Sequence, residues 1–230
     1  ERIHRAPVML YRDLDLTLRV VRDNLSPELD RVICDDRVQH DRLKRFVETF
    51  MPTYADKIEL YQRGEPIFDG YGIELEIDRA LERKVGLKSG GSLIFDQGEA
   101  LTAVDVNTGK FVGSKGRTLE ETITQTNMEA AEEVADQLRL RNVGGLIIID
   151  FIDMDERRNN TAVEKMMKDK LKTDRARIQV GRISGFGLME MSRQRLRPGM
   201  IEATTQPCQA CHGTGLIRSD DNLALSILRS

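Results

Sequence analysis

Two short apolar runs in the sequence end on acidic or amide side chains. One run reads L-T-A-V-D-V-N at residues 101–107, and the other reads L-I-I-I-D-F-I-D at residues 146–153. Side chains alternate between the two faces of a β-strand, so Asp105 and Asn107 point the same way. If the two runs form neighbouring strands, these side chains converge with Asp150 on one cation. Oxygen ligands of this kind suit Mg²⁺, which proteins hold through one or two carboxylates together with water and substrate phosphate.

Asp153 is a further acidic residue of the second run. It lies an odd number of residues beyond Asp150, so a continuing strand turns it to the opposite face. It reaches the cation only if the chain bends after Phe151, and we therefore expect it to support the site rather than to bind the metal. The competing interpretation is that all these carboxylates are ordinary strand ends.

Basic residues follow the acidic part of the chain. Residues 1–150 carry 21 Lys and Arg against 28 Asp and Glu, whereas residues 151–218 carry 13 against 8. Arginine forks match phosphate oxygens, so this segment suits a polyanion such as RNA beside a cation. A solvated surface with patchy charge is the alternative. Candidate RNA contacts are Arg175, Arg177, Arg182, Arg193 and Arg195 and, in a glycine-rich loop, Lys110, Lys115 and Arg117.

Aromatic side chains for base stacking are scarce in this region. Phe186 is the one nearby, so sequence-specific reading of bases is not expected here. The loop at residues 109–117 contains three glycines, but its spacing does not fit a phosphate-binding P-loop. We therefore expect no nucleoside triphosphate site.

Cys208 and Cys211 form a C-x-x-C pair within P-C-Q-A-C-H-G-T-G. A structural zinc ion takes four ligands, and this pair supplies two. A second copy of the chain would complete the site with its own pair, or His212 and another side chain would do so internally. A redox-active pair is a third alternative. We favour a zinc ion shared between two chains, because it accounts for a single half-site.

Composition indicates a globular chain with a sizeable core. The chain has 230 residues, of which 40% are hydrophobic and 32% charged, enough for one large domain or two small ones. No apolar run reaches the roughly 18 residues of a membrane span, and no secretory signal is visible. The three cysteines favour a reducing, cytoplasmic location. Because the sequence opens on Glu1 rather than Met, we expect a fragment of a longer protein.

Periodicity predicts a mixed α/β fold. Helices are expected at residues 14–25, 37–51, 68–85, 118–141, 156–172 and 222–229, and Thr118 with Glu121 predicts a capping box. Strands are expected at residues 7–12, 30–34, 57–61, 92–95, 99–106, 146–150 and 178–183, with a strand or short helix at 188–194.

Five stretches together resemble the ribonuclease E/G family, in the second half of its catalytic region. They are E-A-L-T-A-V-D-V-N-T-G (99–109), the run from E-E-T-I-T-Q-T-N to I-I-I-D-F-I-D-M (120–154), D-R-A-R-I-Q-V (174–180), F-G-L-M-E-M-S-R-Q-R-L (186–196) and C-Q-A-C-H-G-T-G (208–215). The resemblance implies a partial RNase H-like segment at residues 1–86, a DNase I-like catalytic subdomain at 87–200, a zinc link at 201–217 and the start of a dimerisation segment at 218–230.

The resemblance also implies a function. The implied protein is an Mg²⁺-dependent endoribonuclease that cleaves single-stranded RNA to 5′-phosphate and 3′-hydroxyl ends, in rRNA processing and mRNA decay. In this family pattern Asp105 and Asp150 hold the metal, and Asn107 orients a metal-bound water or a phosphate oxygen. Cys208 and Cys211 share a zinc ion with the same pair of a second chain, in a homodimer that belongs to a higher oligomer. Gln209 stands where the family often has proline. The alternative is a non-catalytic RNA-binding and assembly module that uses the cysteines to dimerise.

Overall fold

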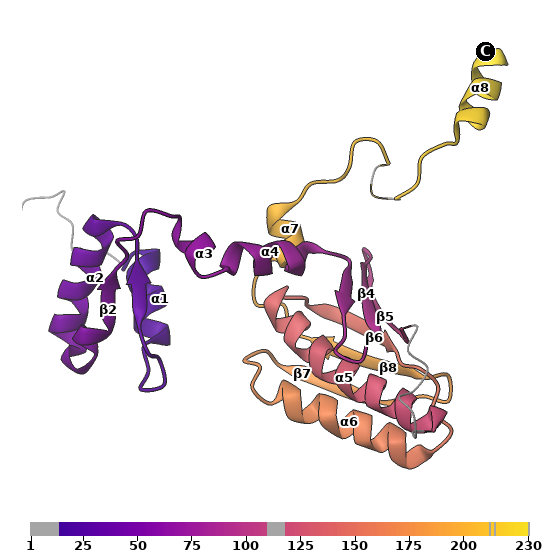
Figure 1. Cartoon of the computed structure of the whole chain (residues 1–230), viewed down its shortest axis with the longest axis horizontal. Helices are drawn as coiled ribbons and strands as arrows, with labels where there is room; N and C mark the ends of the chain where they lie inside the picture. Colours follow the sequence, from indigo (N-terminus) through magenta and orange to yellow (C-terminus); the bar gives the residue numbers. More distant parts are fainter. Residues whose placement is uncertain (1–13, 110–117, 212, 214, 230) are drawn as a thin grey trace, which may run out of the picture. The chain divides into compact units, whose positions relative to one another are not determined.

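The chain forms two compact units, Glu1–Leu75 and Glu76–Ser230. The structure is a computed structural model that describes residues 14–109, 118–211, 213 and 215–229, without the side chains of residues 223 and 226 (Figure 1). The strand expected at residues 7–12 lies outside the described residues. Among the described residues, no helix combines the length and apolarity needed to cross a bilayer.

The first unit is a small helical layer on a two-stranded parallel sheet. Its helices are α1 (Leu16–Asn24), α2 (Arg37–Phe50), the 3₁₀ helix η1 (Pro52–Lys57) and α3 (Ile67–Gly70), and its strands are β1 (Val32–Cys34) and β2 (Ile58–Leu60). Asp15 and Asp36 accept hydrogen bonds from backbone N–H groups in the first turns of α1 and α2. The expected helices and strands of residues 14–61 are therefore confirmed, and these two acids cap the helices, as aspartate often does.

The single helix expected at residues 68–85 is wrong. The chain instead forms α3, then α4 (Ile73–Leu81), then the strand β3 (Lys84–Gly86). Gly72 separates the two helices in a left-handed conformation, with φ of +67°, which ends a helix readily because glycine carries no Cβ. β3 pairs antiparallel with the next strand, and that long-range pairing overrides the helical periodicity of its residues.

The second unit is built on a six-stranded mixed sheet with the order β3-β4-β5-β6-β8-β7. The remaining strands are β4 (Ser92–Gln97), β5 (Leu101–Asn107), β6 (Gly145–Asp150), β7 (Ile178–Ile183) and β8 (Leu188–Arg193). β5 and β6 run parallel, and every other neighbouring pair is antiparallel. The mixed α/β class and the hairpin of β4 and β5 are confirmed, while the subdomain types stay predictions.

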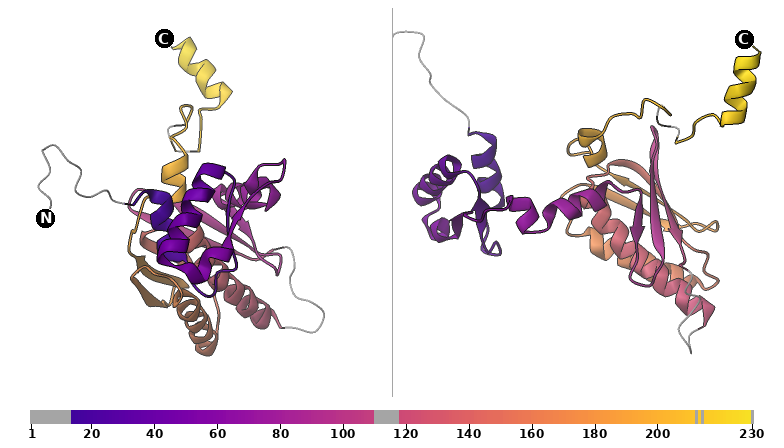
Figure 2. Two further views of the ribbon diagram at one scale, coloured as in Figure 1. Left: turned by 90° about the vertical axis from the view of Figure 1, so that its left-hand side faces the viewer. Right: turned by 45° about the horizontal axis from the view of Figure 1, so that its top comes forward.

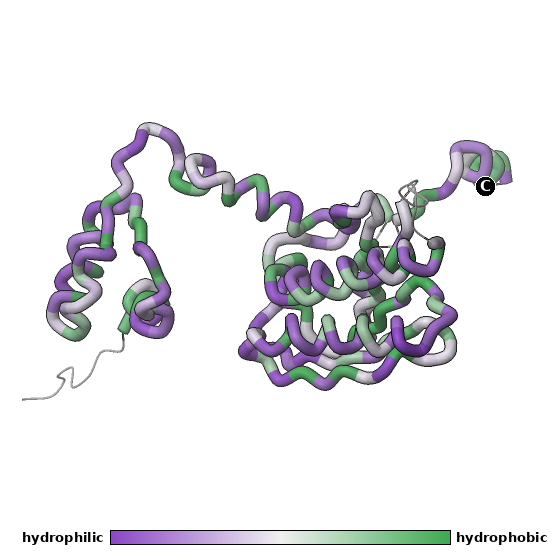
Figure 3. Tube along the Cα trace, turned by 60° about the horizontal axis from the view of Figure 1, so that its bottom comes forward, coloured by the Kyte–Doolittle hydropathy of each residue, from purple (hydrophilic) through white to green (hydrophobic). Residues whose placement is uncertain are grey.

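Two helices, α5 (Leu119–Leu140) and α6 (Arg157–Leu171), lie along the same face of this sheet (Figures 1 and 2). The expected capping box begins α5. Hydrophobic and hydrophilic residues alternate along both helices (Figure 3), and their apolar side chains meet alternate side chains of the strands. The shared core includes Val104, Val106, Ile147, Ile149, Met189, Ala130, Val134, Leu138, Val163 and Met167.

The last helices are α7 (Met200–Thr204) and α8 (Asp220–Leu228). Glu202 anchors α7 to the sheet unit, because its carboxylate accepts hydrogen bonds from Gln97 and from Arg195. The cysteine pair lies between α7 and α8.

Candidate functional site

Asp105 and Asp150 stand side by side on the sheet. They are Cα partners in the parallel pairing of β5 with β6, and neighbouring strands lie about 4.8 Å apart. Paired residues share a face, and both aspartates are exposed while Val104, Val106 and Ile149 are buried on the opposite face. The two parallel strands therefore deliver two carboxylates to one edge of the uncovered face.

Asn107 joins them from the end of β5. Its amide Nδ2 donates a hydrogen bond of 2.8 Å to Oδ2 of Asp105. The three residues singled out in the sequence thus come together, and the amide fixes the orientation of one carboxylate. Oxygen donors in this arrangement fit a hard divalent cation such as Mg²⁺.

Asp153 lies near Asp150 because the chain bends. β6 ends at Asp150, and the N–H of Phe151 donates to the carbonyl of Gly187 at 3.1 Å. A Cβ placed on Gly187 would lie 2.9 Å from Oδ1 of Asp153 and 3.9 Å from Oδ1 of Asp150. Both carboxylates therefore border the same glycine, as expected only for a chain that leaves the strand direction here.

A buried asparagine, which the sequence reading missed, holds this bend. Asn127 of α5 is fully buried; its Nδ2 donates to the carbonyl of Ile152 at 2.8 Å, and its Oδ1 accepts from the Ile152 N–H at 3.1 Å. Ile152 lies between Asp150 and Asp153. The sequence does contain a sign of this role: Asn127 is a polar amide on the apolar stripe of the helix, between Ile123 and Ala130.

Glu120 ties the next part of the loop to α5. Its carboxylate accepts hydrogen bonds from Nδ2 of Asn159 at 2.7 Å and from the N–H groups of Asp155 and Glu156 at 3.4 Å. The Asn159 bond is the main reason that the pKa of Glu120 is lowered from its ordinary value. The segment from Asp153 to the start of α6 is therefore fixed from one helix.

The predicted RNA-contact arginines occupy different environments. Arg193 is 5% exposed and donates through Nε to Asp174 at 2.8 Å and through Nη1 to the carbonyl of Val143 at 2.8 Å. Burial is the largest single influence on the pKa of Asp174 and raises it, but the hydrogen bonds from Arg193 and the Ala176 N–H, together with the charge of Arg193, outweigh burial and lower the pKa overall. In contrast to the expectation, Arg193 points into the protein and is not presented to an RNA at the surface.

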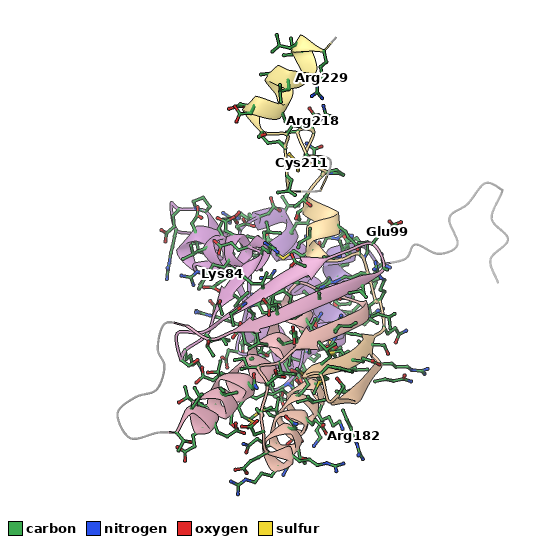
Figure 4. The ribbon with its side chains drawn as sticks, turned by 90° about the vertical axis from the view of Figure 1, so that its right-hand side faces the viewer. Lys84, Glu99, Arg182, Cys211, Arg218 and Arg229 are labelled. Atoms are coloured by element: carbon green, nitrogen blue, oxygen red, sulfur yellow. The ribbon has the colours of Figure 1, made fainter. Side chains whose placement is uncertain are left out.

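The exposed arginines fall into two places. Arg182 lies on the edge strand β7 (Figure 4), two strand positions or about 10 Å across the sheet from β6. Arg175, Arg177 and Arg195 lie toward the other end of the strands, because Arg177 precedes β7 and Arg195 follows β8. Lys110, Lys115 and Arg117 lie outside the described residues.

The cysteine pair forms a turn (Figure 4 labels Cys211). The Cys208 sulfur accepts hydrogen bonds from the backbone N–H groups of Cys211 and Ala210, of which the Cys211 bond has the larger effect. These bonds lower the pKa of Cys208 and so favour the thiolate, the form that binds metals. His212 lies outside the described residues. Within the described part of the chain, no three His, Cys, Asp or Glu side chains gather closely enough to hold a metal ion.

Comparison with known proteins agrees with the motifs. The model of the Ribonuclease E/G family matches residues 1–196. The chain is 43% identical to ribonuclease E of Haemophilus influenzae over 224 residues, which is 97% of this chain and 24% of that protein. It is 45% identical to ribonuclease G of Escherichia coli over 220 residues, which is 96% of this chain and 45% of that protein.

The chain thus spans less than half the length of these relatives. The family model nevertheless covers most of the chain, including the strands that carry Asp105 and Asp150. The resemblance seen in the sequence motifs is confirmed, and this chain belongs to the Ribonuclease E/G family.

Proposed function

We propose that the second unit is the catalytic part of an endoribonuclease that cleaves single-stranded RNA, with Asp105 and Asp150 as its Mg²⁺ ligands. The observation that carries the proposal is their in-register pairing at the ends of two parallel strands. Homology to ribonucleases E and G supports RNA as the substrate.

Each residue has a distinct part in the proposed site. Bound Mg²⁺ supplies charge that polarises a phosphate and lowers the pKa of water. Asn107 holds the Asp105 carboxylate in place through its 2.8 Å hydrogen bond. Asp153 adds negative charge beside Asp150 and supports the site. Exposed Arg182 lies across the sheet, where its guanidinium matches the geometry of RNA phosphate oxygens.

The proposed reaction is hydrolysis of a phosphodiester. A water oxygen bonds to phosphorus and loses a proton to solvent, while the bond from phosphorus to the 3′ oxygen breaks and that oxygen takes up a proton. The products carry a 5′-phosphate and a 3′-hydroxyl. For the longer protein, we propose roles in rRNA processing and mRNA decay.

The test replaces each proposed ligand by its amide. Asp105→Asn and Asp150→Asn should each lower the rate of Mg²⁺-dependent cleavage of a single-stranded oligoribonucleotide at least about 100-fold, because one metal contact is worth several kcal/mol in the transition state. Retained RNA binding and an unchanged thermal unfolding midpoint should accompany the loss.

Glu190→Gln is the matched control. Glu190 is exposed on β8 of the same sheet, paired with Ile148 rather than with Asp150, so it makes the same charge change outside the proposed site. Its cleavage rate should stay within about two-fold of the original chain. Full activity in both aspartate variants would overturn the proposal.

A second candidate is an RNA-binding and assembly module without catalysis. In this module the carboxylates of Asp105 and Asp150 are structural, and the turn that holds Cys208 and Cys211 serves dimerisation. RNA retention with no Mg²⁺-dependent cutting, in the original chain and both variants alike, would support this alternative.

A further inference from the structure

The turn between β7 and β8 is built from closely spaced hydrogen bonds. The N–H of Ser184 donates to the Leu188 carbonyl at 2.8 Å, and the N–H of Gly187 donates to the Ser184 carbonyl at 3.1 Å. The Ser184 hydroxyl accepts from the N–H groups of Phe186 and Leu188, both at 3.3 Å. These contacts fix the backbone on which Phe186 stands.

This turn packs directly against the proposed catalytic edge. Gly187 has a φ of +75°, and a Cβ there would lie 2.9 Å from both the Phe151 carbonyl and Oδ1 of Asp153, so only glycine allows this approach. The next residue, Leu188, is the strand partner of Asp150. Phe186 therefore lies one residue from the backbone that contacts both carboxylates.

The side chain of Phe186 is 85% exposed, although the same sheet buries Phe95 and Phe151 to 6% and 2% exposure. Leaving a phenylalanine in water forgoes the favourable free energy of burying its ring. The neighbouring turn residues are serine and glycine. One aromatic ring is by itself too small for a protein interface, which takes about 800 Å² from each partner.

A single aromatic face does suit a nucleobase. Unpaired bases stack on aromatic side chains with little dependence on sequence, and each such contact strengthens binding roughly 5-fold to 100-fold. An RNA whose phosphate sits at Asp105 and Asp150 has a base within reach of the turn, because the turn adjoins Asp150.

We infer that Phe186 is a substrate-positioning residue that stacks on an unpaired base next to the scissile phosphate of RNA. The inference rests on the proposed function, since it takes its ligand from the proposed site. Stacking of this kind needs an unpaired base, so it favours single-stranded over double-stranded RNA.

The test measures RNA binding without cleavage. The chain contains no tryptophan, so F186W introduces a single indole at the turn. With Mg²⁺ present, addition of a single-stranded oligoribonucleotide whose backbone resists hydrolysis should quench the indole emission, while binding affinity stays within about two-fold of the original chain. F186L keeps the apolar character but not the ring, and should weaken binding between about 5-fold and 100-fold.

Abasic substitutions along the oligoribonucleotide locate the base. Removal of the stacked base should weaken binding to the original chain as much as F186L does, and should have little further effect on F186L. Unchanged thermal unfolding of F186L shows that the loss is not a folding defect.

Equal RNA affinity of F186L and the original chain would overturn the inference and leave the proposed catalytic site intact. Indole emission that shifts with protein concentration, but not with RNA, would overturn it in favour of a contact between protein copies. Absence of RNA binding by the original chain would overturn both this inference and the proposed function.

Discussion

Arg193 and Asp174 form an ion pair that is almost fully buried, with side-chain exposures of 4% and 3%. The pair joins β8 to the segment before β7, and Arg193 also binds the carbonyl of Val143 near the start of β6. Arginine at this position thus connects three neighbouring segments of the sheet unit. Removing one partner of a buried pair leaves an uncompensated charge, which is strongly destabilising.

Asp174→Asn should therefore lower the free energy of unfolding at pH 7 by about 3–5 kcal/mol, measured by urea denaturation. The folded-state pKa of Asp174 is lowered, so its stabilising contribution is complete above the unfolded pKa of about 3.9 and is lost as pH falls through the folded value. The difference between variant and original chain should accordingly shrink in acid.

Asp169→Asn is the control for this prediction. Asp169 pairs with Lys172 in an exposed contact on the last turn of α6, and exposed pairs of this kind often contribute nothing measurable. A difference between Asp174→Asn and the original chain that stays constant from pH 7 to pH 3 would contradict the linkage argument.

At the scale of elements, α5 does more than cover the sheet. It forms the crossover between the parallel strands β5 and β6, and two of its polar residues, Asn127 and Glu120, hold the loop that follows β6. The helix therefore sets both the pairing of the strands that carry Asp105 and Asp150 and the path that brings Asp153 back toward Asp150.

Asn127→Leu should raise the Mg²⁺ concentration for half-maximal cleavage about 10-fold, because residues that orient metal ligands typically change metal affinity 10- to 100-fold. It should also cost about 1–3 kcal/mol of stability, since the N–H and carbonyl of Ile152 lose their partners. Cleavage assays across a Mg²⁺ titration, paired with urea denaturation, measure the two effects.

Thr126→Val separates these effects. Thr126 is also buried on α5, but its hydroxyl donates to the Thr122 carbonyl within the helix. This variant should lose stability without a change in the Mg²⁺ midpoint. Equal midpoints for the variants at positions 126 and 127 would show that Asn127 is structural only.

On the scale of the whole molecule, the proposed chemistry belongs entirely to the second unit. Asp105 and Asp150 lie on its sheet, Asp153 lies in the loop that follows β6, and the cysteine pair lies later in the same unit. The pair of Cys208 and Cys211 supplies two thiolates, so a four-ligand zinc site needs two further ligands from elsewhere. We propose that the Cys208 and Cys211 pair of a second copy of the chain supplies these ligands, so that the chain dimerises when it binds the metal.

The purified chain should therefore contain one zinc ion per two chains, measured by elemental analysis together with sedimentation velocity. Cys208→Ser should lose both the zinc and the dimer, because its thiolate is one of four ligands. Cys34→Ser is the control: Cys34 lies in β1 of the first unit, with its thiol near the Asp36 carbonyl, and should keep both properties. One zinc per chain would contradict the shared site.

Local chemistry by itself determined much of this protein. The alternation in residues 101–107 set which side chains share a face, and the capping residues Asp15, Asp36 and Thr118 set where helices begin. These features depend on the backbone period and on neighbours three residues away, so they are readable from the sequence. The same holds for the family, whose motifs are contiguous.

Only the tertiary structure decided what those side chains meet. The pairing of Asp105 with Asp150 depends on which strands become neighbours across α5. Arg193 is buried against Asp174, which lies 19 residues away in sequence. Asn127 likewise binds a backbone carbonyl 25 residues away. β3 is a strand rather than the end of a helix because β4 offers it hydrogen bonds. Contacts between distant segments decide these outcomes, since burial and pairing energies exceed the local preferences of single residues.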